Sequence, residues 1–335
     1  MLRHNNRQKN DIMRSLFARI VVNAILCAVL SAAVPSYAAL PDQDSQTFSF
    51  YFSVIGYGRA TSFGEPSALA LDRDNSLIFI ADVKAGNVNA FGFQGVSKFQ
   101  YGAKNGLKAP VGLAVGKNDN LFISEDEGGP VKIIDSKGEV SALALPGAEG
   151  EEAPKPGRMT VDQDGNLYVV DRTNCRVYVF DKERKFKFKL GGVGNQRGEF
   201  KMLQDVAVDR QGRIYALDTL GTPVQVFDKN GKFIYRFGSL GEGVQDVSFP
   251  AALFIDRHDQ IWIVDKAQHC LKVFGRSGAF LRKFGDYGLG ESTLFYPIDA
   301  DIDDFGRVYV LEVGARRLQV FSLKRPFEPL RPEGF

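Results

Sequence analysis

The stretch VDQDGNLYVVDRTNCRVYVF, residues 161–180, decides the fold because the chain repeats it. Closely similar chemistry returns as VDRQGRIYALDTLGTPVQVF at residues 208–227 and as IDRHDQIWIVDKAQHCLKVF at residues 255–274. These copies follow one another at intervals of 47 residues. Self-similarity at a fixed period of this size is typical of solenoids and propellers.

Six copies of this unit can be aligned. The residues that stand before the first expected strand of each copy, here called the anchors, are Pro66, Pro110, Pro156, Leu203, Pro250 and Pro297. An acidic residue follows each anchor after 15 or 16 positions: Asp82, Glu125, Asp171, Asp218, Asp265 and Glu312. A residue present in every copy usually serves the unit itself. We therefore expect these six structural repeat acids to accept hydrogen bonds in the following loop.

Each copy contains four strand-like runs. In the third copy they are GRMTVD, LYVVD, RVYVF and FKFKLG, residues 157–191, and turn sequences such as QDGN separate them. Asp-Gly pairs supply the positive φ that tight hairpins need. Four antiparallel strands per unit, repeated six times, predict an all-β fold, a six-bladed β-propeller of four-stranded antiparallel blades.

The sequence also indicates how the ring closes. The last copy ends soon after LQVF, residues 318–321, and lacks a convincing fourth strand. The N-terminal stretch TFSFYFSVIGYG, residues 47–58, resembles the fourth-strand region KFIYRFGSLGEG, residues 232–243. We therefore expect an N-terminal strand at residues 47–55 to complete the last blade beside residues 316–322, which removes an open sheet edge.

The first 38 residues are typical of a secretory signal peptide. Two basic residues precede a short apolar run at residues 20–34, and Ser36-Tyr37-Ala38 follows it. The true start could be Met13, and an uncleaved membrane anchor is the alternative. We expect a single propeller over residues 39–335, exported to the periplasm or beyond, with no membrane span after signal cleavage. The mature chain would carry a net charge of −2, which argues against nucleic-acid binding.

The units resemble NHL repeats, most clearly in PGRMTVDQDGNLYVVDRTNCRVYVF at residues 156–180. The resemblance covers residues 47–325 and implies a propeller. Its members include binding scaffolds, sensor domains and a few lyases, so fold alone does not give function. Lyases that resemble this fold use histidine-bound zinc, whereas this chain holds only His4, His258 and His269. The calcium-binding carboxylate and Asn cluster of lactonase-like propellers cannot be aligned. We therefore expect no metal or cofactor.

Other chemistry has little support in the sequence. No G-x-S-x-G elbow occurs, and no Ser-His pair can be argued. Cys175 and Cys270 lie in copies that are not neighbours, so we interpret them as two buried thiols.

Departures from the repeat are where a particular function can lie. On the face that carries the second-to-third-strand loops, two acidic segments and two basic pairs stand out: Glu125, Asp126, Glu127, Glu149, Glu151, Glu152, Arg172, Arg176, Arg316 and Arg317. A solvated charged surface is the alternative interpretation. At the start of the innermost strand, two positions past each anchor, three copies carry a charge: Arg158, Asp205 and Asp299.

These three charged residues are the candidate small-molecule site at the channel mouth. Arg158 and Asp205 belong to neighbouring copies and could simply pair with each other. Asp299 has only Ala252 and Ala68 beside it in the ring, and a partly buried carboxylate without a partner is costly. Asp299 should therefore find a cation, a backbone donor or a ligand.

The sequence favours a non-catalytic role. We expect an exported scaffold that recognises a protein or peptide partner through its loop face. The alternative is a lyase- or lactonase-type enzyme that acts at the channel mouth.

Overall fold

The structure is a computed structural model that describes residues 48–58, 61–117, 120–147 and 149–323. The predicted signal peptide at residues 1–38 and the predicted start at Met13 lie outside the described residues. Within the described ranges, no helix has the length and apolarity needed to cross a membrane.

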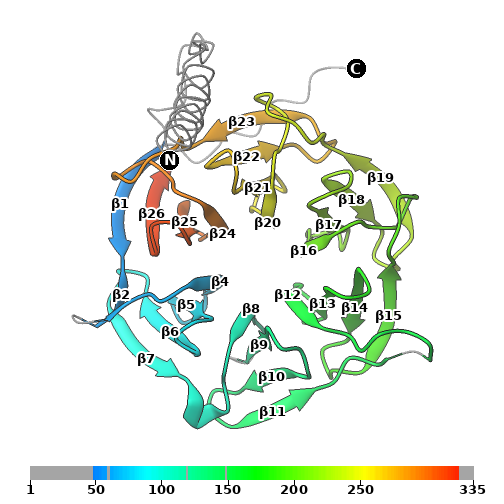
Figure 1. The fold of residues 1–335 in the computed structure, drawn as a ribbon, viewed down its shortest axis with the longest axis horizontal. Helices are drawn as coiled ribbons and strands as arrows, with labels where there is room; N and C mark the ends of the chain where they lie inside the picture. Colours follow the sequence, from blue (N-terminus) through cyan, green and yellow to red (C-terminus); the bar gives the residue numbers. More distant parts are fainter. Residues whose placement is uncertain (1–47, 59–60, 118–119, 148, 324–335) are drawn as a thin grey trace, which may run out of the picture. The chain divides into compact units, whose positions relative to one another are not determined.

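Six four-stranded antiparallel sheets form a ring of blades (Figure 1). The predicted six-bladed propeller is confirmed. Blade 1 holds β4 (Pro66–Asp72), β5 (Leu77–Asp82), β6 (Asn87–Gly92) and β7 (Ser97–Tyr101). Blade 2 holds β8 (Pro110–Val115), β9 (Leu121–Glu125), β10 (Val131–Ile134) and β11 (Val140–Leu143). Blade 3 holds β12 (Pro156–Val161), β13 (Leu167–Asp171), β14 (Arg176–Phe180) and β15 (Phe186–Gly191).

The second half of the ring repeats this order. Blade 4 holds β16 (Leu203–Val208), β17 (Ile214–Asp218), β18 (Val224–Phe227) and β19 (Phe233–Phe237). Blade 5 holds β20 (Pro250–Ile255), β21 (Ile261–Asp265), β22 (Cys270–Phe274) and β23 (Phe280–Phe284). Blade 6 holds β24 (Pro297–Ile302), β25 (Arg307–Glu312) and β26 (Arg317–Leu323), with β1 (Phe48–Val54) as its outermost strand. Every anchor is thus the first residue of an innermost strand.

The N-terminal strand closes the ring, as predicted. β1 pairs antiparallel with β26, from Phe48 opposite Leu323 to Val54 opposite Leu318. The ring of Phe48 stacks on Phe321, with centroids 4.1 Å apart. The two ends of the propeller chain therefore share one sheet, and no blade is left with an incomplete edge.

The hydrophobic core lies between blades. Trp262 of β21 is fully buried and stacks on Phe284 of its own blade. It belongs to a cluster that continues into blade 6 through Val310 and Phe321. Each blade covers its neighbour's apolar face in this way, which explains why one unit alone could not fold stably.

The two faces of the ring differ in their connections. We call turn face the side with the short turns between the first and second strands of each blade, and loop face the side with the second-to-third-strand loops and the blade-to-blade connections.

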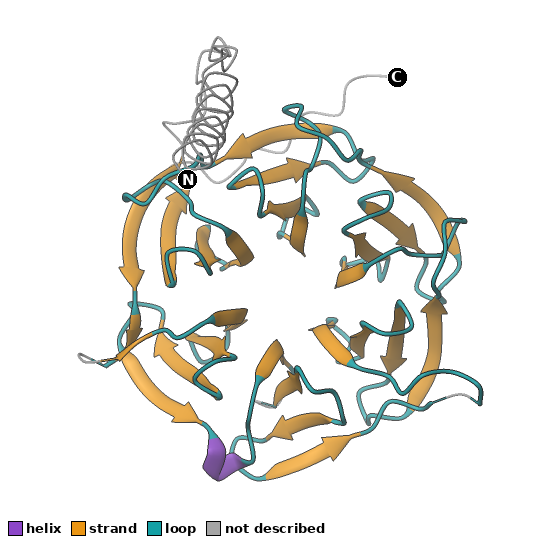
Figure 2. Cartoon of the chain, in the orientation of Figure 1, coloured by secondary structure: helices purple, strands orange, loops and turns teal. Residues whose placement is uncertain are grey.

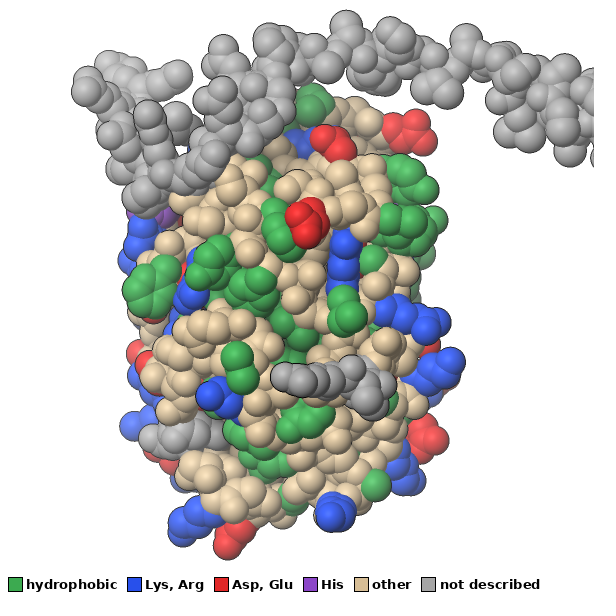
Figure 3. Space-filling model, turned by 90° about the vertical axis from the view of Figure 1, so that its left-hand side faces the viewer, with side chains coloured by type: hydrophobic (Ala, Val, Ile, Leu, Met, Phe, Trp, Pro, Cys, Tyr) green, Lys and Arg blue, Asp and Glu red, His purple; other side chains and the backbone are tan. Residues whose placement is uncertain are grey.

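Strands and loops make up nearly all of the described chain (Figure 2); the helix is η1 (Ala103–Asn105), between blades 1 and 2. A short ribbon, β2 (Gly56–Tyr57) with β3 (Thr61–Ser62), links β1 to blade 1. On the outer wall seen in Figure 3, hydrophobic side chains are scattered among Lys, Arg and polar groups.

Candidate functional site

The six repeat acids accept hydrogen bonds from the backbone that enters their own blade. The Asp171 carboxylate accepts from Lys155 N at 3.0 Å, from Thr173 N at 3.0 Å and from Asn174 Nδ2 at 2.8 Å. Asp265 likewise accepts from the backbone of Ser248 and Phe249. Both acids are fully buried. The repeat acids therefore connect the end of the second strand, through hydrogen bonds, to the chain segment that leads into the blade. Their carboxylate oxygens already accept these hydrogen bonds.

The charged residues of the loop face largely pair with one another. Arg172 Nη1 lies 3.0 Å from Asp126 Oδ1, and Arg176 pairs with Glu151. Arg317 Nε donates to Glu312 Oε1 at 2.8 Å. The basic residues of blade 3 thus neutralise part of the acidic segments of blade 2 and of the following connection.

The remaining candidates of the loop face are dispersed. Glu125 is one of the repeat acids and pairs with Lys132, while Glu127 lies 4.0 Å from Lys108 with both side chains largely exposed. Glu149, Glu152 and Arg316 are exposed at separate places. Of the predicted loop-face residues, Asp126 and Arg172 line a cavity on that face.

Histidines and cysteines do not gather either. His258 and His269 lie beyond opposite ends of β21, and Cys175 and Cys270 are both free and buried. Burial raises the pKa of Cys270 to about 12. Among the residues that the structure describes, no three His, Cys, Asp or Glu side chains are grouped so that they could hold a metal ion. The zinc site of lyases and the calcium cluster of lactonases do not fit this donor set, so we derive no step through a metal.

The three charged residues at the start of the innermost strands do come together. Arg158 of blade 3 reaches across the ring to Asp299 of blade 6, with 2.5 Å between Nη1 and Oδ2. Its Nη2 donates to Ile298 O at 2.7 Å. The predicted alternative, a simple pair of Arg158 with its neighbour Asp205, is therefore not the main contact. We call the Arg158–Asp299 ion pair the crossbar.

A backbone irregularity presents these side chains. The register between the first and second strands shifts just after the anchor, between Pro156 and Met159 in blade 3. The same shift ends at Asp205 in blade 4 and at Asp299 in blade 6. Bulges of this kind re-aim side chains and are frequent beside active sites.

Both carboxylates also cap the next blade. Asp299 Oδ2 accepts from Leu69 N at 2.8 Å, and Asp205 Oδ2 accepts from Leu253 N at 3.0 Å. Each carboxylate also accepts from the following residue in its own strand, Ala300 or Val206. Innermost strands are sheet edges with unpaired N–H groups, so the two acids satisfy donors that would otherwise be left unbonded. Asp299 thus has both a cation and a backbone donor.

Burial makes this cluster electrostatically unusual. Asp205 and Asp299 are 6% and 5% exposed. Burial raises the pKa of Asp205 to about 7; Arg158 opposes this rise and Asp299 adds to it. The two carboxylates share one guanidinium. Burial lowers the pKa of Arg158, but the attraction of Asp299 and Asp205 outweighs burial, so the pKa of Arg158 is raised overall. Asp205 can therefore exchange a proton near neutral pH.

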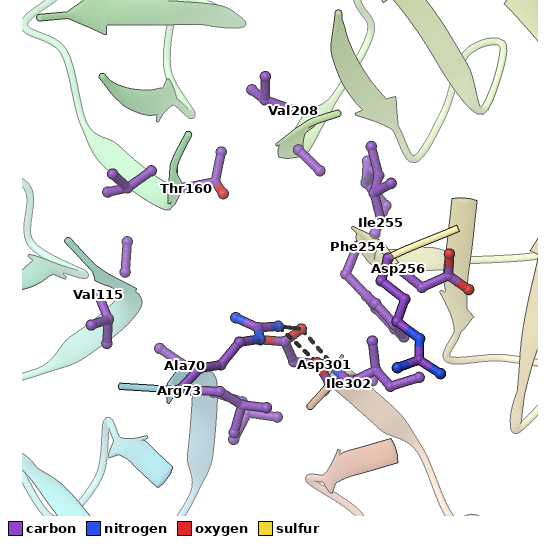
Figure 4. A pocket seen from close by; sticks show the side chains of 18 of the residues that line it. Ala70, Arg73, Val115, Thr160, Val208, Phe254, Ile255, Asp256, Asp301 and Ile302 are labelled. Atoms are coloured by element: carbon purple, nitrogen blue, oxygen red, sulfur yellow. Dashed lines mark hydrogen bonds and ion pairs between the residues drawn. The ribbon is translucent and has the colours of Figure 1, made fainter. Parts of the chain in front are cut away.

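All three residues line one cavity of about 430 Å³ on the ring axis. The cavity begins at the crossbar and runs along the innermost strands. It ends at the turns between the first and second strands, which carry Arg73, Arg257 and His258. Figure 4 shows Arg73 pointing to Asp301 across its wall. The site therefore opens on the turn face, and not near the loop face, where sequence reasoning expected it. A second cavity on the loop-face side shares Arg158 but neither Asp205 nor Asp299.

The wall and the mouth of this cavity were missed from the sequence. The fourth slot after the anchors holds Ala70, Ala114, Thr160, Ala207, Phe254 and Asp301. The seventh slot holds Arg73, Lys117, Gln163, Arg210, Arg257 and Asp304. Four basic residues among these six were the signal available in the sequence, because the same slot in successive blades forms one ring around the axis.

Comparison with known proteins supports the fold. A family model described as a 6-bladed beta-propeller matches residues 154–224 and 210–271. No curated protein matches the chain in sequence. A gluconolactonase structure from Xanthomonas campestris is 15% identical, with a TM-score of 0.60 over 83% of this chain and 95% of that one. Virginiamycin B lyase from Staphylococcus aureus is 12% identical, with a TM-score of 0.61 over 82% and 99%.

A further solved structure, a protein of unknown function from Bacteroides thetaiotaomicron, is 16% identical, with a TM-score of 0.62 over 82% of this chain and 75% of that one. At these identities the likeness shows the fold alone. The chain is thus a six-bladed β-propeller with a buried charged cluster on its axis.

The predicted non-catalytic binding scaffold requires correction. The similar structures include gluconolactonases and streptogramin-type lyases, which are named for reactions and not for binding partners. Four of the loop-face residues on which the scaffold prediction depended pair with one another, Arg172 with Asp126 and Arg176 with Glu151. Arg158, Asp205 and Asp299, in contrast, line one cavity together. The alternative prediction, an enzyme at the channel, is therefore carried forward.

Proposed function

We propose that this protein is an enzyme of lyase or lactonase type that acts in the turn-face cavity of the channel. One observation carries the proposal: Asp205, a buried acid with a pKa near 7, lines the same cavity as the Arg158 guanidinium. Asp205 is the proton-transferring group, and Arg158 stabilises negative charge on the substrate. Asp299 is a positioning residue that holds Arg158 through the crossbar.

The two residues suit reactions at a carbonyl group. In lactone hydrolysis, the Asp205 carboxylate takes a proton from water while the water oxygen bonds to the carbonyl carbon. The carbonyl π electrons move onto oxygen, where Arg158 stabilises them. The oxyanion then re-forms the carbonyl, the ring C–O bond breaks, and protonated Asp205 returns the proton to the leaving oxygen. The product is a hydroxy acid.

In the lyase variant the same groups act on a carbon–hydrogen bond. Asp205 takes the proton from the carbon next to the carbonyl, and the C–H electrons form an enolate that Arg158 stabilises. The enolate re-forms the carbonyl and a new C=C bond as the leaving group departs with the electrons of its bond, and Asp205 returns the proton to it. Lactone opening adds the mass of water to the substrate, and elimination divides it in two. Mass analysis of the products therefore distinguishes the variants.

Arg158 retains donors for a substrate. A guanidinium has five N–H groups. Asp299 and Ile298 O are the contacts of Arg158 in the described structure.

General acid–base catalysis by a positioned group contributes about 10²- to 10⁴-fold, so loss of Asp205 should have an effect of this size.

The test is turnover by the full chain and two variants on a panel of lactones and of β-substituted carbonyl compounds, read by mass spectrometry. Asp205→Asn removes the proton-transferring group at constant volume. Asp164→Asn changes an exposed acid in a turn of blade 3, outside the cavity lining, and is the matched control. We expect turnover by the unmodified chain and by the control, and a loss of at least about 100-fold in Asp205→Asn. Absence of turnover by the unmodified chain, or equal turnover by Asp205→Asn, would overturn the proposal.

We also propose that the enzyme is exported and that its units are NHL repeats. Export rests on the basic-then-apolar segment at residues 14–38, and the repeat assignment on the unit at residues 156–180. Cell fractionation followed by N-terminal sequencing tests the first point: a start near residue 39 supports it, and an intact N-terminus in the cytoplasm overturns it.

A further inference from the structure

Two arginines on adjacent blades lie at the mouth of the turn-face cavity without forming an ion pair in the described part of the chain. Arg210 of blade 4 and Arg257 of blade 5 occupy the same slot and line the same cavity. In the described part of the chain, neither has a carboxylate within ion-pair distance. Among the described residues, Arg257 donates to Asp304 O at 3.1 Å and to His258 Nε2 at 3.2 Å.

Other charges at this mouth are already engaged. Arg73 donates to Asp301 Oδ1 at 2.7 Å and to Ile302 O at 2.8 Å. The turn acids Asp209 and Asp303 pair with Arg213 and Arg307. Asp256 accepts from Trp262 Nε1 and from two backbone N–H groups of its turn. Asp304 is the one acid in the slot, and Asp259, which also lines the cavity, pairs with Arg276. Arg210 and Arg257 are therefore the arginines of the cavity lining that have no ion pair within the described residues.

The wall between this mouth and the crossbar includes apolar side chains on the same side, among them Phe254, which is 7% exposed. Phe254 is the large residue in a slot that is otherwise filled by Ala, Thr and Asp. It stacks on the buried Trp262 at 5.4 Å, so its ring is held in place. A ligand body that lies against Phe254 would have Arg257 toward the mouth and Asp205 toward the crossbar. Guanidinium groups bind carboxylates through paired hydrogen bonds and are weakly hydrated, which suits them to this role.

We infer that the cavity takes a small organic carboxylate with an apolar body, and that Arg210 and Arg257 bind its carboxylate. The inference rests on the proposed function and names its substrate class: a carbonyl compound that also carries a carboxylate. The crossbar limits passage toward the loop face, so this substrate enters and leaves through the turn face.

Binding of simple probes tests the inference without turnover. Benzoate and benzamide have the same shape, and only benzoate is charged. Calorimetric titration of the full chain at low ionic strength should show benzoate binding at least about tenfold more tightly than benzamide, because hydrogen bonds between ionised groups are stronger than those to a neutral amide. The double variant Arg210→Gln/Arg257→Gln should lose this preference. Arg316→Gln, at an exposed arginine of the loop face, is the control and should keep it.

The outcomes separate this inference from the proposed function. Equal binding of benzoate and benzamide, no benzoate binding, or unchanged binding in the double variant would overturn the carboxylate site. If the double variant turned over neutral substrates as well as the unmodified chain does, the carboxylate site would also be overturned. The enzyme proposal would then still stand. Selective benzoate binding by a chain that turns over nothing would overturn the enzyme proposal alone.

Discussion

Arg158 and Asp299 join opposite blades of the ring, with Nη1 of the arginine 2.5 Å from Oδ2 of the aspartate. Blades 3 and 6 have no contact through their sheets, because they face each other across the axis (Figure 1). The crossbar therefore links two halves of the propeller that are otherwise connected only around the ring. It also separates the turn-face cavity from the loop-face cavity.

The crossbar should contribute measurably to stability. Removal of one partner leaves a buried charge uncompensated, which costs about 3 to 5 kcal/mol. We expect Asp299→Ala and Arg158→Met each to lower the free energy of unfolding, and the double variant to lose less than the sum. Denaturant unfolding of the full chain in a double-mutant cycle measures this coupling, expected at about 1 to 3 kcal/mol.

The matched control for this cycle is the exposed pair Lys108–Glu127, whose side chains are 75% and 79% exposed. Its coupling should be close to zero because solvent screens exposed pairs. If the crossbar coupled no more strongly than this pair, Arg158 and Asp299 would be structurally independent, and the positioning role of Asp299 would be lost.

The N-terminal strand should hold the whole ring. Replacement of residues 48–54 by a Gly-Ser linker of equal length removes the stacking of Phe48 on Phe321 and opens the edge of β26. We expect the melting temperature to fall by about 10 °C or more, because several apolar side chains lose their burial and the ring melts as one unit. Calorimetry measures it. Phe305→Ala, at a residue that is 81% exposed, should leave the melting temperature unchanged. A similar temperature for all three chains would contradict closure by β1.

Asp205 should make stability depend on pH. Its pKa rises from 3.8 to about 7 on folding, so between these values the folded chain keeps a proton that the unfolded chain has lost. The folded state binds more protons, and the free energy of unfolding therefore falls as pH rises through this range. Relative to Asp205→Asn, the unmodified chain should lose on the order of 3 kcal/mol between pH 4 and pH 8, measured by denaturant unfolding. A difference that stays constant with pH would show that Asp205 does not titrate there.

Sequence periodicity predicted the fold well because propeller blades are local structures. Every anchor from Pro66 to Pro297 begins an innermost strand, and the stretch around Phe48 resembles the fourth strand it replaces. Spacing within one unit fixes strands and turns, and the period fixes the number of blades. The repeat acids, such as Asp171, could be assigned a role from recurrence alone.

The site was only partly accessible to the same reasoning. Arg158, Asp205 and Asp299 stand out as charges in a slot that is elsewhere small. Their pairing was not predictable, because sequence order makes Arg158 and Asp205 neighbours and says nothing of a side chain that crosses the axis. Arg210 and Arg257 were missed because they lie in turns, where single charges are ordinary and only the comparison of one slot across all blades sets them apart.

The central claim is that Asp205 is an acid–base group poised near neutral pH beside Arg158. The most direct measurement is an NMR titration of the Asp205 carboxyl carbon in the full, aspartate-labelled chain, with the signal assigned by its absence in Asp205→Asn. The account predicts a midpoint of about 7. A midpoint near the ordinary aspartate value of 3.8 would contradict it, because Asp205 would then be permanently ionised and could not return a proton at neutral pH.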